Sequence, residues 1–179
     1  GLRARGQGWS DLGLETRLVS WRSAVGVFAK SIPVFVAATG AFVFGAILMA
    51  NIVGMPERID MSKYDYLRGN LMLTLLALLS VYFVSSFAEE VIYRGFMITR
   101  LTDGAAASAV TRSVAVIISS LLFGFVHSDW GIAGMVQASL MGIALGASYL
   151  AVKRNLWVTI LAHGYMDTLL VLQMYVGGS

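Results

Sequence analysis

The chain has 179 residues, of which 58% are hydrophobic and 13% charged, with a net charge of +3 at pH 7. Soluble domains are about half apolar and about a quarter charged, and a soluble globule of this length would leave too much apolar surface in water. The composition therefore argues against an ordinary soluble protein and favours a membrane domain. The absence of cysteine excludes disulfides, thiolate zinc sites and a cysteine nucleophile.

The basic residues are scattered among apolar runs instead of forming a patch, so they indicate membrane topology and no nucleic-acid partner. Because the first residue is Gly1 rather than Met, we expect the sequence to be a piece of a longer protein.

The first uncharged stretch, residues 31–56, exceeds the roughly 20 apolar residues that span a bilayer. It begins the predicted transmembrane domain, 31–179, and follows a cytoplasmic or interfacial amino-terminal segment, 1–30. Within that segment, Leu14 to Phe28 has apolar residues at helical spacing. This stretch is either a helix on the membrane surface or a soluble tail.

Four further helices follow the first. Residues 55–68 carry both charge signs around Pro56 and are predicted to form an exposed connection. The later helices are predicted at about 69–100, 105–127, 131–152 and 155–176, with a turn at Thr102-Asp103-Gly104 after the second. The predicted fold class is therefore all-α, a polytopic membrane helical bundle with about five transmembrane helices.

Lysine and arginine are distributed unequally between the two ends of these helices. Nine of the 13 lie on the side of the amino terminus, three lie on the opposite side in the connection 55–68, and Arg94 lies within a helix. The positive-inside rule predicts a cytoplasmic amino terminus and an external carboxyl terminus. We expect an integral membrane protein of the bacterial plasma membrane.

Ionisable residues inside a membrane helix are costly and by default suggest function. This chain has six: Glu89, Glu90, Arg94, His127, His163 and Asp167. Glu90 and Arg94 are four residues apart and share a helix face, so they are predicted to form an ion pair. Glu89 points about 100° away from Glu90. It is left without that partner and is a candidate general base.

The two histidines lie on helices that can bring them to this carboxylate. His127 shares a face with Phe123, and His163 shares one with Asp167. Glu89 lies about 16 Å along its helix from Arg100, and His163 lies about 14 Å from Arg154, so both reach the middle of the membrane. His127 and Asp167 are expected about one helical turn nearer the outside.

Three motifs carry a family resemblance, and they occur in the order Glu89-Glu90-Val91-Ile92-Tyr93-Arg94, Phe123-Gly124-Phe125-Val126-His127 and His163-Gly164-Tyr165-Met166-Asp167. They resemble the EExxxR, FxxxH and HxxxN/D motifs of the CPBP intramembrane proteases, which are named for CAAX proteases and bacteriocin-processing enzymes and are also called the Abi family. A stripe of Gly142, Gly146 and Tyr149 is similar to a weaker glycine motif of that family. The resemblance covers about residues 70–175.

The resemblance implies an intramembrane endopeptidase that acts on a peptide or protein substrate at the bilayer. Glu89 would be the base that activates water together with His127, and Glu90 and Arg94 would orient it. His163 and Asp167 would stabilise the oxyanion or hold water. Many relatives have asparagine at the last position. Because a carboxylate donates no hydrogen bond unless it is protonated, Asp167 would instead orient His163 or bind a metal.

The need for a metal stays open at this point. Two histidines and a carboxylate form a known zinc set, so His127 and His163 are the possible ligands, with Glu89 or Asp167 as a third. The chain has no His-Glu-x-x-His motif, and a ligating Glu89 would not easily also serve as the base. We therefore favour a mechanism without a cofactor and keep zinc as the alternative.

Other functions account for parts of the pattern. The six residues would also suit a proton or ion carrier, a non-proteolytic interaction or immunity protein of the same family, or, through the two histidines, a haem protein. Serines at 85, 86, 119 and 120 could suggest a serine protease. Without a Gly-x-Ser-x-Gly motif, we attribute these serines to helix packing.

Overall fold

The computed structural model describes residues 6, 8–14, 20–54, 62–102 and 108–177. All of the regular structure in these ranges is helical. The elements in chain order are η2 (Trp9–Leu12), α1 (Trp21–Val53), η3 (Ser62–Leu67), α2 (Leu71–Ser80), η4 (Val81–Ala88), η5 (Glu90–Ile98), α3 (Thr99–Thr102), α4 (Ala109–Phe125), η6 (Ser128–Trp130), α5 (Gly131–Ala151) and α6 (Leu156–Val176).

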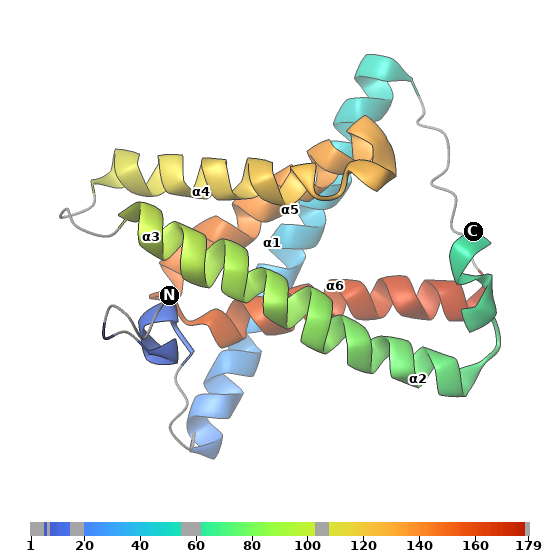
Figure 1. Ribbon diagram of the computed structural model, residues 1–179, viewed down its shortest axis with the longest axis horizontal. Coiled ribbons are helices and arrows are strands. Elements are labelled where there is room, and N and C mark those ends of the chain that lie inside the picture. Colours follow the sequence, from blue (N-terminus) through green and yellow to red (C-terminus); the bar gives the residue numbers. More distant parts are fainter. Residues whose placement is uncertain (1–5, 7, 15–19, 55–61, 103–107, 178–179) are drawn as a thin grey trace.

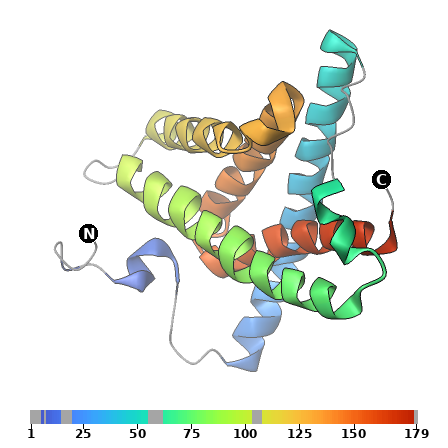
Figure 2. The same ribbon diagram turned by 45° about the vertical axis from the view of Figure 1, so that its right-hand side comes forward.

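The elements α2, η4, η5 and α3 run on into one long helix, which we call the central helix, Leu71–Thr102. Its η4 part packs against α6 and its η5 part packs against α4 (Figure 1). On the other side of the bundle, α5 packs on both α1 and α4. Figure 2 shows from a second direction that α6 lies beside the amino-terminal half of the central helix, α2 and η4. This arrangement brings α4, α5 and α6 to the middle of the central helix.

Three helices are long and apolar enough to cross a membrane in the part of the chain that the structure describes: Trp21–Val53, Leu71–Thr102 and Ser128–Ala151. Ala109–Phe125 is apolar but shorter. Large apolar side chains are exposed along these helices, among them Phe44, Phe83 and Leu121. In water they would be costly, whereas in lipid they meet an apolar solvent. The predicted all-α membrane bundle is confirmed, and a helix occupies each of the five predicted stretches, although only the three named above meet the length and hydropathy of a membrane span in the part of the chain described.

The first helix begins earlier than predicted. α1 starts at Trp21, where the side chain of Ser20 accepts a hydrogen bond from the backbone N–H of Ser23. Residues 21–28 therefore belong to the membrane helix and not to a separate surface helix or a soluble tail. The sequence predicts a start after Lys30, because a charged residue is unfavourable in a membrane helix. The exposed Lys30 can however extend its ammonium group toward the membrane surface while its aliphatic part stays on the helix.

Smaller corrections concern the connections. The third predicted helix, 105–127, is α4 and ends at Phe125, so His127 lies in the turn that follows it. Part of the predicted connection 55–68 forms the 3₁₀-helix η3. Pro56, Asp103, Gly104 and residues 15–19 of the predicted surface helix lie outside the described residues.

Residues 8–14 of the amino-terminal segment dock on the bundle. Leu12 and Leu14 are almost fully buried, and the backbone carbonyl of Gly13 accepts a hydrogen bond from Leu156 N–H at 3.1 Å. The hydroxyl of Tyr149 donates to the Leu12 carbonyl at 3.2 Å. The segment therefore joins the ends of α5 and α6 to the central helix, where Leu12 lies against Gly95.

Candidate active site

Glu90 and Arg94 form a buried ion pair in η5, a π-helical segment of the central helix. Arg94 Nη1 lies 2.7 Å from Glu90 Oε1, and the exposed fractions of the two side chains are 1% and 0%. The guanidinium also lies 3.4 Å from the Gly142 carbonyl and 4.5 Å from the centre of the Phe123 ring. The two buried charges therefore neutralise each other, and the pairing is the one that the i, i+4 spacing predicts.

The glycine stripe on α5 makes this close packing possible. A Cβ atom at Gly142 would lie 3.0 Å from Cβ of Ser120 on α4, and one at Gly146 would lie 3.0 Å from a methyl carbon of Val116. Small residues let membrane helices approach closely. At Gly142 the close approach also exposes the backbone carbonyl to Arg94.

His163 joins this ion pair from α6. Its Nδ1 lies 3.0 Å from Glu90 Oε1, the same oxygen that accepts from Arg94. An ionised carboxylate can only accept hydrogen bonds, so Nδ1 carries the proton and donates it to Glu90. The opposite ring nitrogen, Nε2, is thereby directed toward the remaining site residues. The sequence suggested Asp167 for this orienting task, but Glu90 makes the direct hydrogen bond.

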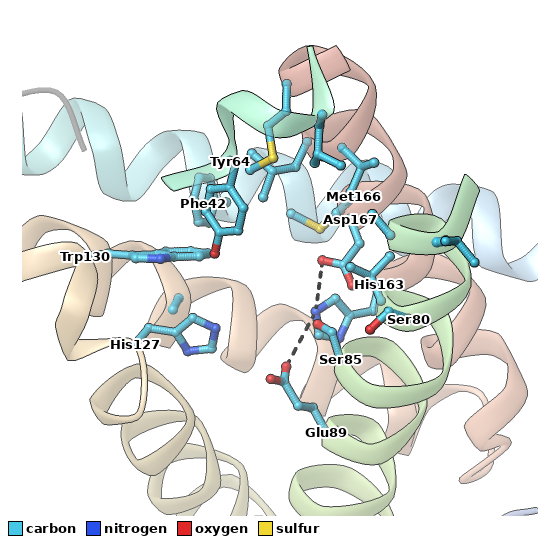
Figure 3. A pocket seen from close by; sticks show the side chains of 18 of the residues that line it. Phe42, Tyr64, Ser80, Ser85, Glu89, His127, Trp130, His163, Met166 and Asp167 are labelled. Carbon is cyan, nitrogen blue, oxygen red and sulfur yellow. Dashed lines mark ion pairs between the residues drawn. The ribbon is translucent and has the colours of Figure 1, made fainter. Parts of the chain in front are cut away.

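Two carboxylates face Nε2 of His163. Glu89 Oε2 and Asp167 Oδ1 each lie 3.8 Å from this atom, with exposed side-chain fractions of 26% and 17% (Figure 3). The separation is too long for a direct hydrogen bond but suits an ion pair or a bridging water molecule. The expected meeting of Glu89 and His163 at the same depth is therefore present in the structure.

His127 faces Glu89 from the other side of the cavity (Figure 3). Its Nδ1 lies 2.8 Å from the carbonyl oxygen of Phe123, and because a carbonyl only accepts, Nδ1 carries the proton and leaves Nε2 as an acceptor. The ring packs between Phe123 and Trp130, each with a ring-centre distance of 4.8 Å. His127 is presented to the cavity from the turn that follows α4, not from the helix itself.

A cavity of about 670 Å³ contains Glu89, His127, His163 and Asp167 at one end. Its other walls are mainly apolar and come from α1, η3, α2, α5 and α6; they include Phe42, Tyr64, Leu67, Leu76, Met141 and Leu170. Glu90 and Arg94 lie behind this surface and do not line it. The six predicted residues therefore gather in one place, four on the cavity surface and two in support.

Two serines at the site were assigned to packing in the sequence: Ser85 lines the cavity, and Ser86 bonds to a site residue. The hydroxyl of Ser86, on η4, donates to Asp167 Oδ2 at 2.8 Å. Ser119 and Ser120 instead donate to backbone carbonyls of Tyr93 and Val116, as expected of packing serines. The available signal was that Ser86 precedes Glu89 and Glu90 by one helical turn, which puts it near the same face.

The donor set does not fit a metal ion. No group of three or more His, Asp or Glu side chains within the described ranges is arranged to hold one. The Nδ1 hydrogen bonds of His163 to Glu90 and of His127 to the Phe123 carbonyl do not bear on this point, because a zinc-binding histidine commonly donates its other ring N–H in the same way. The mechanism proposed for this site therefore uses only side chains and water.

A cavity lined by Glu89, His127, His163 and Asp167 and supported by Glu90 and Arg94 is consistent with what a comparison of the sequence with known families finds. The Rce1-like family, described as type II CAAX prenyl endopeptidase Rce1-like, matches residues 71–169. This stretch contains all six predicted site residues. No curated protein and no solved structure gives a significant match. The family match confirms the predicted CPBP relationship, and the chain is a membrane protein that belongs to the Rce1-like family of type II CAAX prenyl endopeptidases.

Proposed function

We propose that this protein is a CAAX-type endopeptidase that hydrolyses a peptide bond inside the membrane with a water molecule activated by Glu89 and His127. The observation that carries the proposal is the position of Glu89. Its carboxylate lies at the polar end of an otherwise apolar cavity, is partly exposed there, and is flanked by the two histidines (Figure 3). Water and a peptide can meet at that point.

Glu89 is the general base in this mechanism. Its side chain is 26% exposed, and Oε2 has no hydrogen-bond partner among the described side chains and backbone, so the carboxylate is free to take a proton from a water molecule in the cavity. His127 Nε2 accepts the second hydrogen of the same water molecule and orients it. After attack on the carbonyl carbon, Glu89 returns the proton to the departing amine nitrogen.

His163 stabilises the oxyanion of the tetrahedral intermediate. Its Nδ1 is held by Glu90, and in its doubly protonated form Nε2 donates toward the cavity. Three carboxylates near the ring, those of Glu89, Glu90 and Asp167, support the positive charge. Glu90 and Arg94 fix this ring without touching the substrate, so they are positioning residues.

The apolar cavity suits a lipid-modified or hydrophobic substrate. We propose a peptide or protein of the CAAX type as the partner, reached from the bilayer, since the family description names a prenyl endopeptidase and the cavity walls are aliphatic and aromatic. We further propose that the membrane domain, predicted as 31–179 and beginning with α1 at Trp21, is the protease domain, with the bacterial plasma membrane as its location and a cytoplasmic amino terminus.

The proposal is tested with the purified protein in liposomes and a prenylated CAAX-type peptide. The parent should release the carboxyl-terminal fragment, Glu89→Gln should lose about 100-fold or more of kcat, and Ser120→Ala should retain parental activity. Ser120 is a matched control because it is buried and bonds within its own helix. No cleavage by the folded parent, or equal cleavage by Glu89→Gln, would overturn the proposal.

A further inference from the structure

Ser86 and Asp167 form a polar link between the two helices of the site. Ser86 is fully buried on η4, and its hydroxyl donates to Asp167 Oδ2 on α6 at 2.8 Å. A second link, between Glu90 and His163, joins the same pair of helices. Glu89 lies between Ser86 and Glu90 in the sequence, so the two links bracket it.

The hydrogen bond from Ser86 determines which carboxylate oxygen of Asp167 points toward His163. Because Oδ2 accepts from Ser86, Oδ1 is the oxygen that faces His163 Nε2, at 3.8 Å. Glu89 Oε2 lies at the same distance from that nitrogen. Asp167 and Glu89 therefore share one histidine nitrogen, and neither is close enough for a direct hydrogen bond with it.

We propose that Ser86 is a positioning residue that holds Asp167 away from His163, so that Nε2 stays available to the reacting carbonyl. This role rests on the proposed peptidase function and extends it to a residue outside the three motifs. Ser86 acts through Asp167 and touches no reacting atom.

The physical reason lies in what Asp167 does without its donor. A carboxylate that is 17% exposed in a membrane bundle needs hydrogen-bond donors. Once the Ser86 hydroxyl is removed, Nε2 of the doubly protonated His163, 3.8 Å from Oδ1, is a donor that Asp167 can reach by a small side-chain rotation. A direct bond between them would occupy Nε2 and draw the ring toward Asp167. Substrate binding in the apolar part of the cavity would be unaffected.

The test is a double-mutant cycle with Ser86→Ala, Asp167→Ala and the double variant, with Ser120→Ala as the control. Steady-state kinetics with the prenylated peptide in liposomes should show kcat about tenfold lower in Ser86→Ala, with KM within about twofold of the parent. In the Asp167→Ala background, Ser86→Ala should cause no further loss of kcat, because the carboxylate that Ser86 positions is already absent.

A matched pair separates the hydroxyl from packing. Ser86→Thr keeps the donor and Ser86→Val has nearly the same shape without it, so threonine should retain more kcat than valine at equal thermal stability. Equal kcat in these two variants, an equal loss from Ser86→Ala in both backgrounds, or a parental kcat in Ser86→Ala would overturn the positioning role while the peptidase function stands. A folded parent that cleaves nothing overturns the peptidase function itself.

Discussion

Glu90 and His163 lie 73 positions apart in the chain, and His163 Nδ1 is 3.0 Å from Glu90 Oε1. The same oxygen lies 2.7 Å from Arg94 Nη1. One buried oxygen of Glu90 therefore both pairs with the positive charge of Arg94 and orients the ring of His163 on α6. The second glutamate of the motif supports the site from behind, and the first faces the cavity.

Breaking the buried ion pair should cost stability as well as activity. In Glu90→Gln or Arg94→Ala, one partner remains charged in a place without water, at a cost of about 3 to 5 kcal/mol. Thermal unfolding in detergent should show a clear loss for both variants and little change for Glu89→Gln, whose side chain is 26% exposed. Equal midpoints in all three variants and the parent would show that the pair does not stabilise the fold.

Removal of His127, which orients the water in the proposed mechanism, should lower activity without lowering stability. His127→Ala should lower kcat by about 100-fold or more and leave the fold largely intact, because the ring is half-buried at the cavity edge. His127→Gln, which retains an acceptor, should lose less. A His127→Ala enzyme with parental kcat would assign water activation to Glu89 alone.

Much of the site follows from the sequence because the constraint is local. The spacing of four between Glu90 and Arg94 fixes their contact on any regular helix, and the shared depth of Glu89 and His163 follows from counting residues along two helices. The hydrogen bonds from His163 to Glu90 and from Ser86 to Asp167 depend on how two helices rotate against each other, which the pattern of one chain does not contain.

The amino-terminal segment illustrates the same limit. The docked residues 8–14 are too few to show a periodicity, and the contacts that hold them come from the ends of distant helices. α1 starts before the predicted boundary because a long exposed side chain such as that of Lys30 is compatible with a membrane helix.

Gly13→Ala should destabilise the protein. Gly13 has a φ of +86°, and a Cβ atom there would lie 1.8 Å from the carbonyl oxygen of Arg154. The left-handed conformation alone costs about 1 to 2 kcal/mol, and the overlap forces residues 8–14 off the bundle. The control is Gly26→Ala on α1, where a Cβ meets no atom within 4 Å. A Gly13→Ala protein as stable as the parent would show that this segment is not docked.

The membrane topology can be read by cysteine labelling, since the chain has no cysteine of its own. A cysteine at Gly8, which is exposed, should react only from the cytoplasmic side, and one at the exposed Ser62 should react from outside. The measurement is the accessibility of each single-cysteine variant to a membrane-impermeant maleimide in intact cells. Labelling of position 8 from outside would reverse the proposed orientation.

Metal removal should leave the enzyme active. The purified active protein is expected to contain well under one zinc per chain, and a chelator should not change kcat, because the proposed mechanism uses Glu89 and His127 directly on water. Stoichiometric zinc that disappears in His163→Ala, with activity restored to the chelated enzyme only by added metal, would instead make His127 and His163 ligands.

The role of Glu89 in activating water is tested most directly by single-turnover hydrolysis in ¹⁸O-labelled water. The parent protein is reconstituted in liposomes and kept in molar excess over the prenylated peptide. Mass spectrometry should then show one ¹⁸O atom in the new carboxylate of the product. Hydroxylamine should trap no acyl-enzyme. Glu89→Gln, with unchanged thermal stability, should form the labelled product about 100-fold or more slowly. A folded Glu89→Gln protein that forms it at the parental rate, or a trapped acyl-enzyme in the parent, would contradict the mechanism.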